Sequence, residues 1–514
     1  MIGRLGWRTG AGIAAAALVA LSLTACSGTS TSDSTSARGD VLRVSTQTME
    51  SINPALSNQA AQVPRLAYES LLDTDDDGTV VGQLAEDWSW DDDTYTSLTL
   101  TLRDGLSFSD GDALDADAVV GSFEYFVGAG GPNASLYGGI TSAKVDDDTV
   151  RFTSEVADPD LPLLLTGTYF GGSVISPTGV ADPTLLETES HGIGPYVYSD
   201  IQVGSEYDLV PSDTYYDQSR IHFDSVELPV ISTESAQTAA LLSDQVDLVY
   251  SSVSTSWSST LAAHDDLTVT LGTPAWLGLE LLDTQGEVVP ALGDERVRQA
   301  IMYALDRDAI TTAVFGGLAG PRVQAANSTW LGFDDALEST YAYDPDAAKE
   351  LLSEAGYADG FTIPVVITGE GVASTFMQAI DGYLSAVGIH LDIQTVPDIA
   401  GFAAALATGT VAGAAMPMAQ SSVSQFIDFF YGENAVMNPL GQVDDRLVAL
   451  TETARATNAE SDWTAVLSYI DETALTVPIS STPDIWVSAD TIDVSAAHNP
   501  ATSGFDITDV VPAS

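Results

Sequence analysis

Short segments in which polar and apolar residues alternate mark the predicted strands of this chain. The clearest is Thr96–Leu102, where every second residue near its end is leucine, and Val41–Ser45 has a similar pattern. A period of two places alternate side chains on one face, so each segment predicts a strand with one buried face. The same reasoning predicts strands at 207–210 and 225–230 and a hairpin over 145–156.

Apolar residues at helical spacing predict helices, most of them in the second half of the chain. Asp115 is a suitable N-cap for a helix whose Val119, Val120, Phe123 and Phe126 share one face. Asp294 and Asp344-Pro345 open two more, and Gly356 closes the second of them. Further helices are predicted at about 63–72 and 373–387, with strands at 361–367 and 389–393.

These patterns divide the chain into two styles. The first third is rich in strands, whereas later helices alternate with single strands, as in α/β layers. Hydrophobic residues make up 45% of the sequence and charged residues 17%, a balance typical of a folded globule. We therefore predict an α/β protein with at least two lobes.

The N-terminus has the features of a bacterial lipoprotein signal. Arg4 and Arg8 precede an apolar stretch, Ala11–Leu23, that is shorter than the ~20 residues of a spanning helix. Leu23-Thr24-Ala25-Cys26 matches the lipoprotein box, and Cys26 is the only cysteine in the chain. We predict a signal peptide over 1–25, a lipid on Cys26 and a flexible Ser/Thr-rich tether over 26–39.

The formal net charge is −57, and Lys144 and Lys349 are the only lysines. Such a charge repels the phosphates of nucleic acids and disfavours electrostatic adhesion to anionic lipid. We expect no nucleic-acid partner. The acidic residues are interpreted as a solvated surface, which identifies no ligand.

Five long segments occur in an order that resembles one family. They are Leu84–Phe126 (beginning LAEDWSW), Gly192–Asp217 (GIGPYVYSD), Ser235–Tyr250 (SAQTAALLSDQVDLVY), Asp294–Pro321 (DERVRQAIMYALDRD) and Tyr343–Tyr357 (YDPDAAKELLSEAGY). They resemble the markers of the extracytoplasmic solute-binding proteins of ABC importers, in the branch that includes dipeptide, oligopeptide and nickel binders.

This resemblance implies a two-lobed periplasmic-binding-protein (clamshell) fold with an extra α+β subdomain in the first lobe. It places lobe I at 40–68, 187–272 and 481–514, the extra subdomain at 69–186 and lobe II at 273–480. It also implies capture of a small solute between the lobes and delivery to a membrane permease, while separate subunits hydrolyse ATP. A lipid-anchored monomer on the extracytoplasmic face of the cell membrane, without a cofactor, is expected.

The resemblance makes a peptide the first expected cargo, but one feature of peptide-binding members is missing. Those proteins carry an aspartate late in lobe II that pairs with the peptide's ammonium group. The corresponding segment here, Ala415–Asn434, has no acid ahead of its aromatic helix, and Asp428 within that helix is a possible displaced substitute. An oligosaccharide or another non-peptide organic solute is therefore an alternative cargo.

Candidate ligand-binding residues come from positions at which the family's lobes face each other. Packing in the core is an equally valid interpretation for each of them. The candidates are Thr46, Gln47, Thr48, Tyr169, Phe170, Trp276, Met418, Gln420, Ser421 and Ser424.

The stretch beginning Asp73-Thr-Asp-Asp-Asp-Gly78 has the spacing of a calcium-binding loop, with Asp73, Asp75 and Asp77 as ligands. The twelfth position is Leu84 rather than the Glu of an EF-hand, so a turn before a strand is favoured and calcium stays an alternative. The five histidines are scattered singly, which disfavours a transition-metal site.

No motif of a hydrolase accompanies these features. The sequence contains neither a G-x-S-x-G elbow nor an H-E-x-x-H pair, and no phosphate-binding G-x-x-x-x-G-K-[ST] loop. We predict that the protein is not an enzyme. A lipoprotein that serves as a scaffold or as the partner of a sensor, without a closable cleft, is the remaining alternative.

Overall fold

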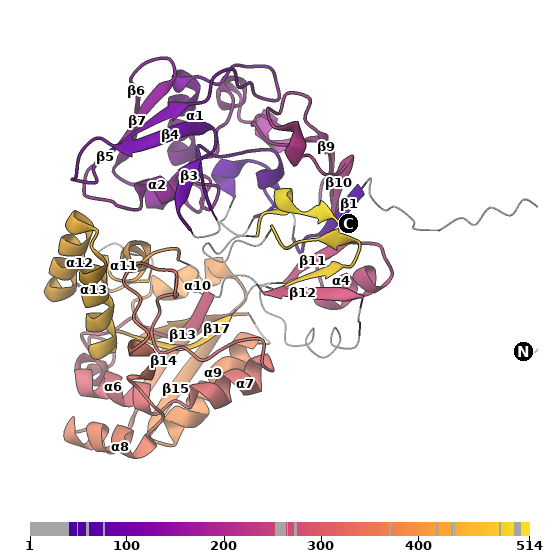
Figure 1. The fold of residues 1–514 in the computed structure, drawn as a ribbon. Helices are drawn as coiled ribbons and strands as arrows, with labels where there is room; N and C mark the ends of the chain where they lie inside the picture. The colour runs from indigo at the N-terminus through magenta and orange to yellow at the C-terminus, as the bar shows by residue number, and fades with distance from the viewer. Residues whose placement is uncertain are drawn as a thin grey trace, which may run out of the picture. The chain divides into compact units, whose positions relative to one another are not determined.

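Two large sheets and one smaller sheet organise the chain in the computed structural model (Figure 1). The structure describes residues 41–48, 50–57, 61–75, 78–251, 264, 266–271, 275–369, 372–417, 420–432, 435, 437–482, 485–497 and 505–513. Gly39–Ser514 form one unit.

The first large sheet has seven strands, in the order β12-β18-β11-β1-β10-β9-β8. Strand β1 lies between β10 and β11 and is parallel to both, whereas the other pairs are antiparallel. The strands are β1 (Val41–Ser45), β8 (Tyr196–Gln202), β9 (Glu206–Pro211), β10 (Ser225–Pro229), β11 (Leu248–Ser251), β12 (Leu267–Leu271) and β18 (Ile485–Ala489). This sheet therefore joins the start, the middle and the end of the chain.

The second large sheet has five strands, in the order β15-β14-β16-β13-β17. They are β13 (Ala275–Leu281), β14 (Phe361–Thr368), β15 (Ile389–Val396), β16 (Gly413–Ala415) and β17 (Thr476–Thr482). Strand β14 is parallel to β15 and β16, and helices α9 (Val372–Ser385) and α10 (Ile399–Leu406) pack against β14 and β15 (Figure 1). Parallel strands with covering helices are the α/β arrangement predicted from the sequence.

Further helices surround this sheet and contribute to its two buried hydrophobic clusters. They are α6 (Glu295–Tyr303), α7 (Arg307–Phe315), α8 (Pro345–Glu354), α11 (Val423–Phe430), α12 (Asp445–Thr457) and α13 (Glu460–Glu472). The predicted caps are confirmed, because Asp294 accepts from the backbone N–H of Arg296 and Asp344 accepts from those of Asp346 and Ala347.

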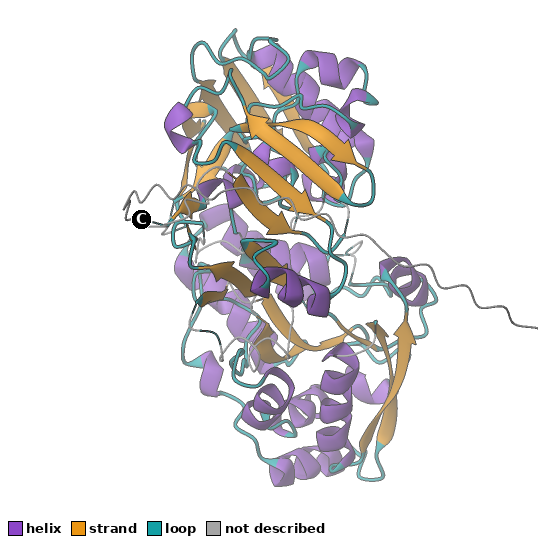
Figure 2. Ribbon diagram, turned by 90° about the vertical axis from the view of Figure 1, so that its right-hand side faces the viewer, coloured by secondary structure: helices purple, strands orange, loops and turns teal. Residues whose placement is uncertain are grey.

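The smaller sheet is antiparallel, in the order β4-β5-β7-β6. Figure 2 shows the mixture of helices and strands throughout the chain. Its strands are β4 (Ala85–Trp90), β5 (Ser97–Leu102), β6 (Ile140–Lys144) and β7 (Thr149–Ser154), and helix α1 (Ala116–Ala129) packs on β6 and β7. Leu98, Leu100 and Leu102 of β5 are buried, as the alternating pattern predicted. Asp115 caps α1 by accepting from the backbone N–H of Ala118.

The remaining elements are short. They are the hairpins β2 (Leu72–Thr74) with β3 (Val80–Gly82) and β19 (Ile492–Asp493) with β20 (Val511–Pro512), the helices α2 (Leu161–Leu164), α3 (Pro177–Ala181) and α4 (Glu234–Leu242), and eight 3₁₀ turns among the described residues.

Two predicted elements differ from the structure. The hairpin expected over 145–156 is formed by β6 and β7 over 140–154, with its turn between Lys144 and Thr149. The expected helix at 63–72 is a single 3₁₀ turn, Pro64–Leu66, followed by extended chain that enters β2. The backbone N–H groups of Glu69, Leu71 and Leu72 donate to carbonyls of distant residues, at Ile193, Gly172 and Leu165. Pairing with other segments satisfies these donors outside a helix, so tertiary structure overrides the local pattern.

Candidate functional site

Helix α11 presents hydroxyl and amide side chains at its N-terminal end. Ser422 is the N-cap, and its Oγ accepts from the backbone N–H of Gln425 at 3.1 Å. Further along the same helix, Phe426 and Phe430 are buried against Trp276. The aromatic side chains fix the helix, so the polar residues at its start are held in place.

Those polar residues contact a segment more than 250 positions earlier in the chain. Tyr169 donates its hydroxyl proton to Gln425 Oε1, and its oxygen lies 3.0 Å from Ser421 Oγ, which therefore acts as the donor. Ser422 Oγ donates to the carboxylate of Asp160. Tyr169 packs in the buried cluster of the four-stranded sheet, whereas Phe426 of α11 packs in a cluster of the five-stranded sheet. The junction therefore joins the parts of the chain that contain these two sheets.

A cavity of about 320 Å³ lies at this junction. Residues from 135–138 and 154–164 line one side, and residues of α11 and α12 line the other. Its charged lining residues are Asp158, Asp160, Asp428 and Arg455. Its volume falls within the range of about 300–1,000 Å³ of small-molecule sites.

The four charged groups fall into two kinds. Arg455 forms an ion pair with Asp428 at 2.6 Å and donates from Nε to Ser424 Oγ at 2.9 Å. Asp158 and Asp160 are half-buried, and the structure shows no ion pair for either among the residues it describes. Burial raises the pKa of both carboxyl groups, and their mutual repulsion adds to the effect at Asp160.

The candidates after β1 lie at the end of the seven-stranded sheet. Thr46 is buried and forms an isolated bridge with Val230. Gln47 is half-buried and donates to Gln237 Oε1 at 3.3 Å, whereas Thr48 is exposed. The structure does not bring these three residues to the cavity at the junction.

Of the aromatic candidates, Tyr169 lies at the junction, and the other two are fully buried. Phe170 packs under the guanidinium of Arg65, 5.0 Å from the ring centroid. Trp276 belongs to the cluster around Phe426, and its indole N–H has no partner among the described residues.

The late candidates divide between the junction and its surroundings. Ser421 contacts Tyr169, and Ser424 lines the cavity and accepts from Arg455. Gln420 is half-buried next to them. Met418 and Cys26 lie outside the described residues.

The described residues of the acidic stretch, 73–75 and 78, lie at the turn end of the β2–β3 hairpin. Asp73 accepts from the backbone N–H of Thr74 at 2.8 Å, and Asp75 accepts from that of Thr79 at 2.8 Å. Gly78 has a φ of 81°, which suits glycine at a tight turn. Asp77 lies outside the described residues, and among those that are described no group of three or more His, Cys, Asp or Glu side chains is arranged to hold a metal ion.

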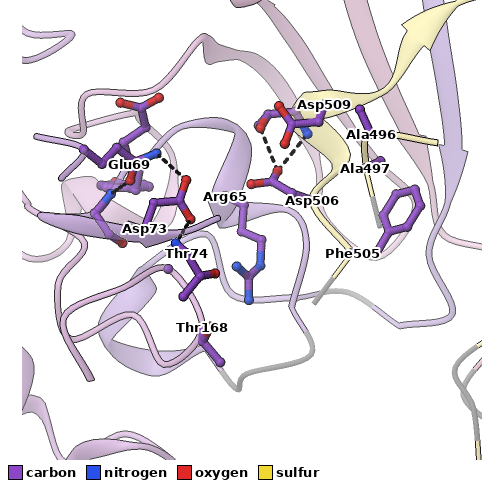
Figure 3. Close-up of a pocket in the computed structure, with 15 residues that line it drawn as sticks. Arg65, Glu69, Asp73, Thr74, Thr168, Ala496, Ala497, Phe505, Asp506 and Asp509 are labelled. Atoms are coloured by element: carbon purple, nitrogen blue, oxygen red, sulfur yellow. Dashed lines mark hydrogen bonds between the residues drawn. The ribbon is translucent and has the colours of Figure 1, made fainter. Parts of the chain in front are cut away.

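Asp73 also lines a second cavity, of about 110 Å³, close to the C-terminal segment (Figure 3). Glu69 lies in the same wall, and burial raises its pKa to about 7. Arg220 pairs with Glu69 at 3.1 Å and with Asp509 at 2.9 Å. These internal partners give the cluster a role in tying the C-terminal segment to the start of the chain.

The sequence did not single out Asp158, Asp160, Gln425 or Arg455. The first two belong to an Asp-Pro-Asp loop between β7 and α2, which resembles any acidic turn of this chain. Only the fold places this loop against α11, so no local signal marks it.

The mixed sheets and the polar junction between two sheet-containing parts define a two-lobed solute-binding protein with the periplasmic-binding-protein fold. AgaA of A. tumefaciens R10, solved with agropinic acid, has this fold, with a TM-score of 0.76 and 22% sequence identity over 92% of this chain and 98% of that chain. The predicted fold class is confirmed.

The chain belongs to the bacterial extracellular solute-binding proteins, family 5, whose family model matches residues 79–433. Heme-binding protein A of Haemophilus influenzae is 26% identical over 302 residues, covering 54% of each chain. The dipeptide-binding protein of Escherichia coli is 27% identical over 352 residues, covering 62% of this chain and 63% of that protein. The matches thus span between about half and two thirds of these relatives' lengths. Within the described part of the chain, no helix is long and apolar enough to cross a membrane.

Proposed function

We propose that this chain is the substrate-binding component of an ABC importer. It captures a small solute between its two lobes and delivers it to a membrane permease whose ATPase subunits are separate. In this proposal lobe I comprises 40–68, 187–272 and 481–514, its extra subdomain 69–186, and lobe II 273–480. Each sheet falls almost wholly within one of these divisions, which supports the assignment.

The single observation that carries the proposal is the junction at α11. A cavity of about 320 Å³ has walls from both parts of the chain, and Tyr169 and Ser421 contact each other beside it. A solute held by both walls favours the state in which the walls meet, because only that state makes both sets of contacts. The permease would recognise that state.

A peptide is the first cargo to test. The dipeptide-binding protein of Escherichia coli is among the relatives of this chain, and the cavity combines charged with amide and hydroxyl groups. An oligosaccharide or another organic solute is the alternative outcome of the same test.

The test is native mass spectrometry of the chain purified from its own cells, followed by thermal shifts with peptide and sugar panels. A ligand at 100 times its Kd stabilises the folded state by about 2.7 kcal/mol, which shifts the melting temperature measurably. X-ray scattering should show compaction with the same ligand. A chain that retains no solute, shifts with no panel and never compacts is a scaffold or sensor partner instead.

The lipid anchor is part of the proposal. Cys26 follows a signal-like stretch in a lipoprotein box, which supports attachment to the extracytoplasmic face of the cell membrane. Cys26→Ala should abolish incorporation of a labelled fatty acid and release the protein from the membrane fraction. Unchanged labelling would contradict the anchor.

The proposed function includes no turnover. The named relatives are binding proteins, which supports this part of the proposal. Saturable hydrolysis of a peptide or glycoside by the purified mature chain would refute it.

A further inference from the structure

Three hydrogen bonds cross the junction directly from one side chain to another. The hydroxyl of Tyr169 donates to Gln425 Oε1 and lies 3.0 Å from Ser421 Oγ. Ser422 Oγ donates to the carboxylate of Asp160. The partners are 252 to 262 positions apart in the chain. Each contact joins two atoms of the protein itself, so it stabilises the meeting of the two sides whichever solute is bound.

These contacts are shielded from water. Tyr169 is 3% exposed and Gln425 is 7% exposed. A hydrogen bond is stronger in such surroundings than at an exposed surface, because the local dielectric constant is lower. When the two sides separate, the same groups must bond to water instead. The contacts therefore favour the arrangement in which the sides meet.

The turn that carries Tyr169 is held in one conformation. Phe170 has a φ of 65°, a left-handed value that is rare for an aromatic residue, and its ring packs beneath the guanidinium of Arg65. Asn133 Nδ2 donates to the backbone carbonyl of Tyr169 at 3.2 Å and to that of Ser57 at 3.3 Å. Such a backbone conformation persists only where the surrounding structure fixes it. The hydroxyl of Tyr169 is therefore presented at a fixed place.

The facing groups on α11 are positioned as well. Ser422 Oγ accepts from the backbone N–H of Gln425 at 3.1 Å, so the hydroxyl that caps the helix is also the donor to Asp160. Gln425 Oε1 accepts from the backbone N–H of Ser421 at 3.2 Å, which orients the amide for Tyr169. Groups that are in place before they meet lose little conformational freedom on contact.

We propose that Tyr169 and Asp160 on one side and the start of α11 on the other form a latch that holds the two lobes together independently of the cargo. The empty protein then spends part of its time closed, and a solute completes the closure. Apparent affinity for any solute that requires the closed state rises with the closed fraction of the empty protein. This inference rests on the proposed function, because a latch matters only where the two sides separate.

The experiment measures the distance between two spin labels in the empty mature chain by double electron–electron resonance. Cys26 is the only cysteine, so a Cys26→Ala background allows specific labelling at Glu124→Cys on α1 and Glu350→Cys on α8, both exposed positions. Dialysis out of urea removes retained solute, and native mass spectrometry verifies that the chain is empty.

The latch variant is Asp160→Ala/Tyr169→Phe. It removes all three crossing contacts and leaves the cap of α11 by Ser422 intact. The matched control, Asp213→Ala/Tyr343→Phe, replaces the same residue types at exposed positions. Melting curves establish that each variant is folded.

A hydrogen bond of this kind changes an equilibrium by about 2- to 12-fold. Wild type and the control should therefore populate a short distance, and the latch variant should lower the ratio of closed to open chains at least about 10-fold. Each single substitution should give an intermediate ratio.

An unchanged ratio in the latch variant, or one single distance shared by every chain, would overturn the latch. Both results leave the transport function standing, because the empty chain is measured without a solute. That function fails only if the peptide and sugar panels reveal no bound solute.

Discussion

Glu280 allows a direct test of whether burial without a partner determines the protonation of an acid in this fold. It lies in β13, in the five-stranded sheet, and is 1% exposed, and neither carboxyl oxygen has a partner among the described residues. Thr476 lies opposite it on β17. Thr476 Oγ1 and the hydroxyl of Tyr431 are also buried without a hydrogen-bond partner among the described residues. All three residues line a cavity of about 20 Å³, the size of one water molecule.

Burial raises the pKa of Glu280 well above its ordinary value of 4.5. When folding raises the pKa of a group, its contribution to stability is complete at pH values below its pKa in the unfolded chain. This contribution is lost as the pH rises through its pKa in the folded protein. Between the two values the loss is about 1.4 kcal/mol per pH unit. Glu280→Gln keeps the shape, has no proton to lose and removes this dependence.

The free energy of unfolding should therefore change differently in wild type and in Glu280→Gln. From pH 5.5 to pH 6.5, the stability of wild type relative to the variant should fall by about 1.4 kcal/mol, since acids common to both proteins cancel in the difference. Urea unfolding followed by tryptophan fluorescence measures it, because Trp276 and Trp463 lie in a core cluster of the same part of the chain.

The control is Glu350→Gln at an exposed position on α8, for which the difference from wild type should stay constant over the same range. A constant difference for Glu280→Gln as well would mean that Glu280 is already ionised in the folded protein. Burial without a partner would then not determine its protonation, and the reasoning would be refuted.

Three further substitutions test other parts of the fold. Gly278→Ala places a Cβ 2.1 Å from the carbonyl oxygen of Val477, so a loss of at least about 2 kcal/mol is expected in urea unfolding, and an unchanged midpoint would contradict the close approach. Burial alone would raise the pKa of Asp283, but hydrogen bonds from backbone N–H groups, led by that of Val289, lower it below 3.8. Asp283→Asn should therefore lower the free energy of unfolding by about 1–3 kcal/mol at pH 7 and by progressively less as the pH falls below 3.8. A difference from wild type that stays constant with pH would contradict this. Tyr169→Phe removes the hydroxyl that links both sides of the junction, so weaker ligand binding is expected in calorimetry with little change in the melting temperature, whereas unchanged affinity would place the contact outside the recognition site.

Local sequence signals predicted much of the fold because they act over a few residues. A carboxylate at Asp115 or Asp294 satisfies N–H groups two or three positions later, and a leucine at every second position of β5 buries one face. The segment at 63–72 failed because its backbone donors bond to carbonyls about 90 to 125 residues away, as from Leu72 to Leu165 and from Glu69 to Ile193. No local pattern encodes such partners.

The candidate site likewise contains some residues that the sequence predicted and others that depend on long-range contacts. Resemblance to a family placed Ser421, Ser424 and Tyr169 where lobes face each other, and the structure brings these residues to one junction. Asp160 escaped prediction because its contact with Ser422 joins positions 262 apart. A carboxylate whose role depends on a partner so distant in sequence looks like every other acid of a chain with 73 of them.

The contact between Ser422 and Asp160 explains the serines at the start of α11. The segment before the helix carries hydroxyls where peptide-binding relatives are expected to carry an acid, yet a carboxylate reaches the same place from the opposite side of the junction. A serine hydroxyl donates to that carboxylate as a neutral partner, so the contact joins the two sides of the junction without cancelling the charge. Because Asp160 and Ser422 belong to different parts of the two-lobed fold, this arrangement forms only when those parts meet. In the function proposed above, a solute that both sides contact would stabilise the state in which they meet.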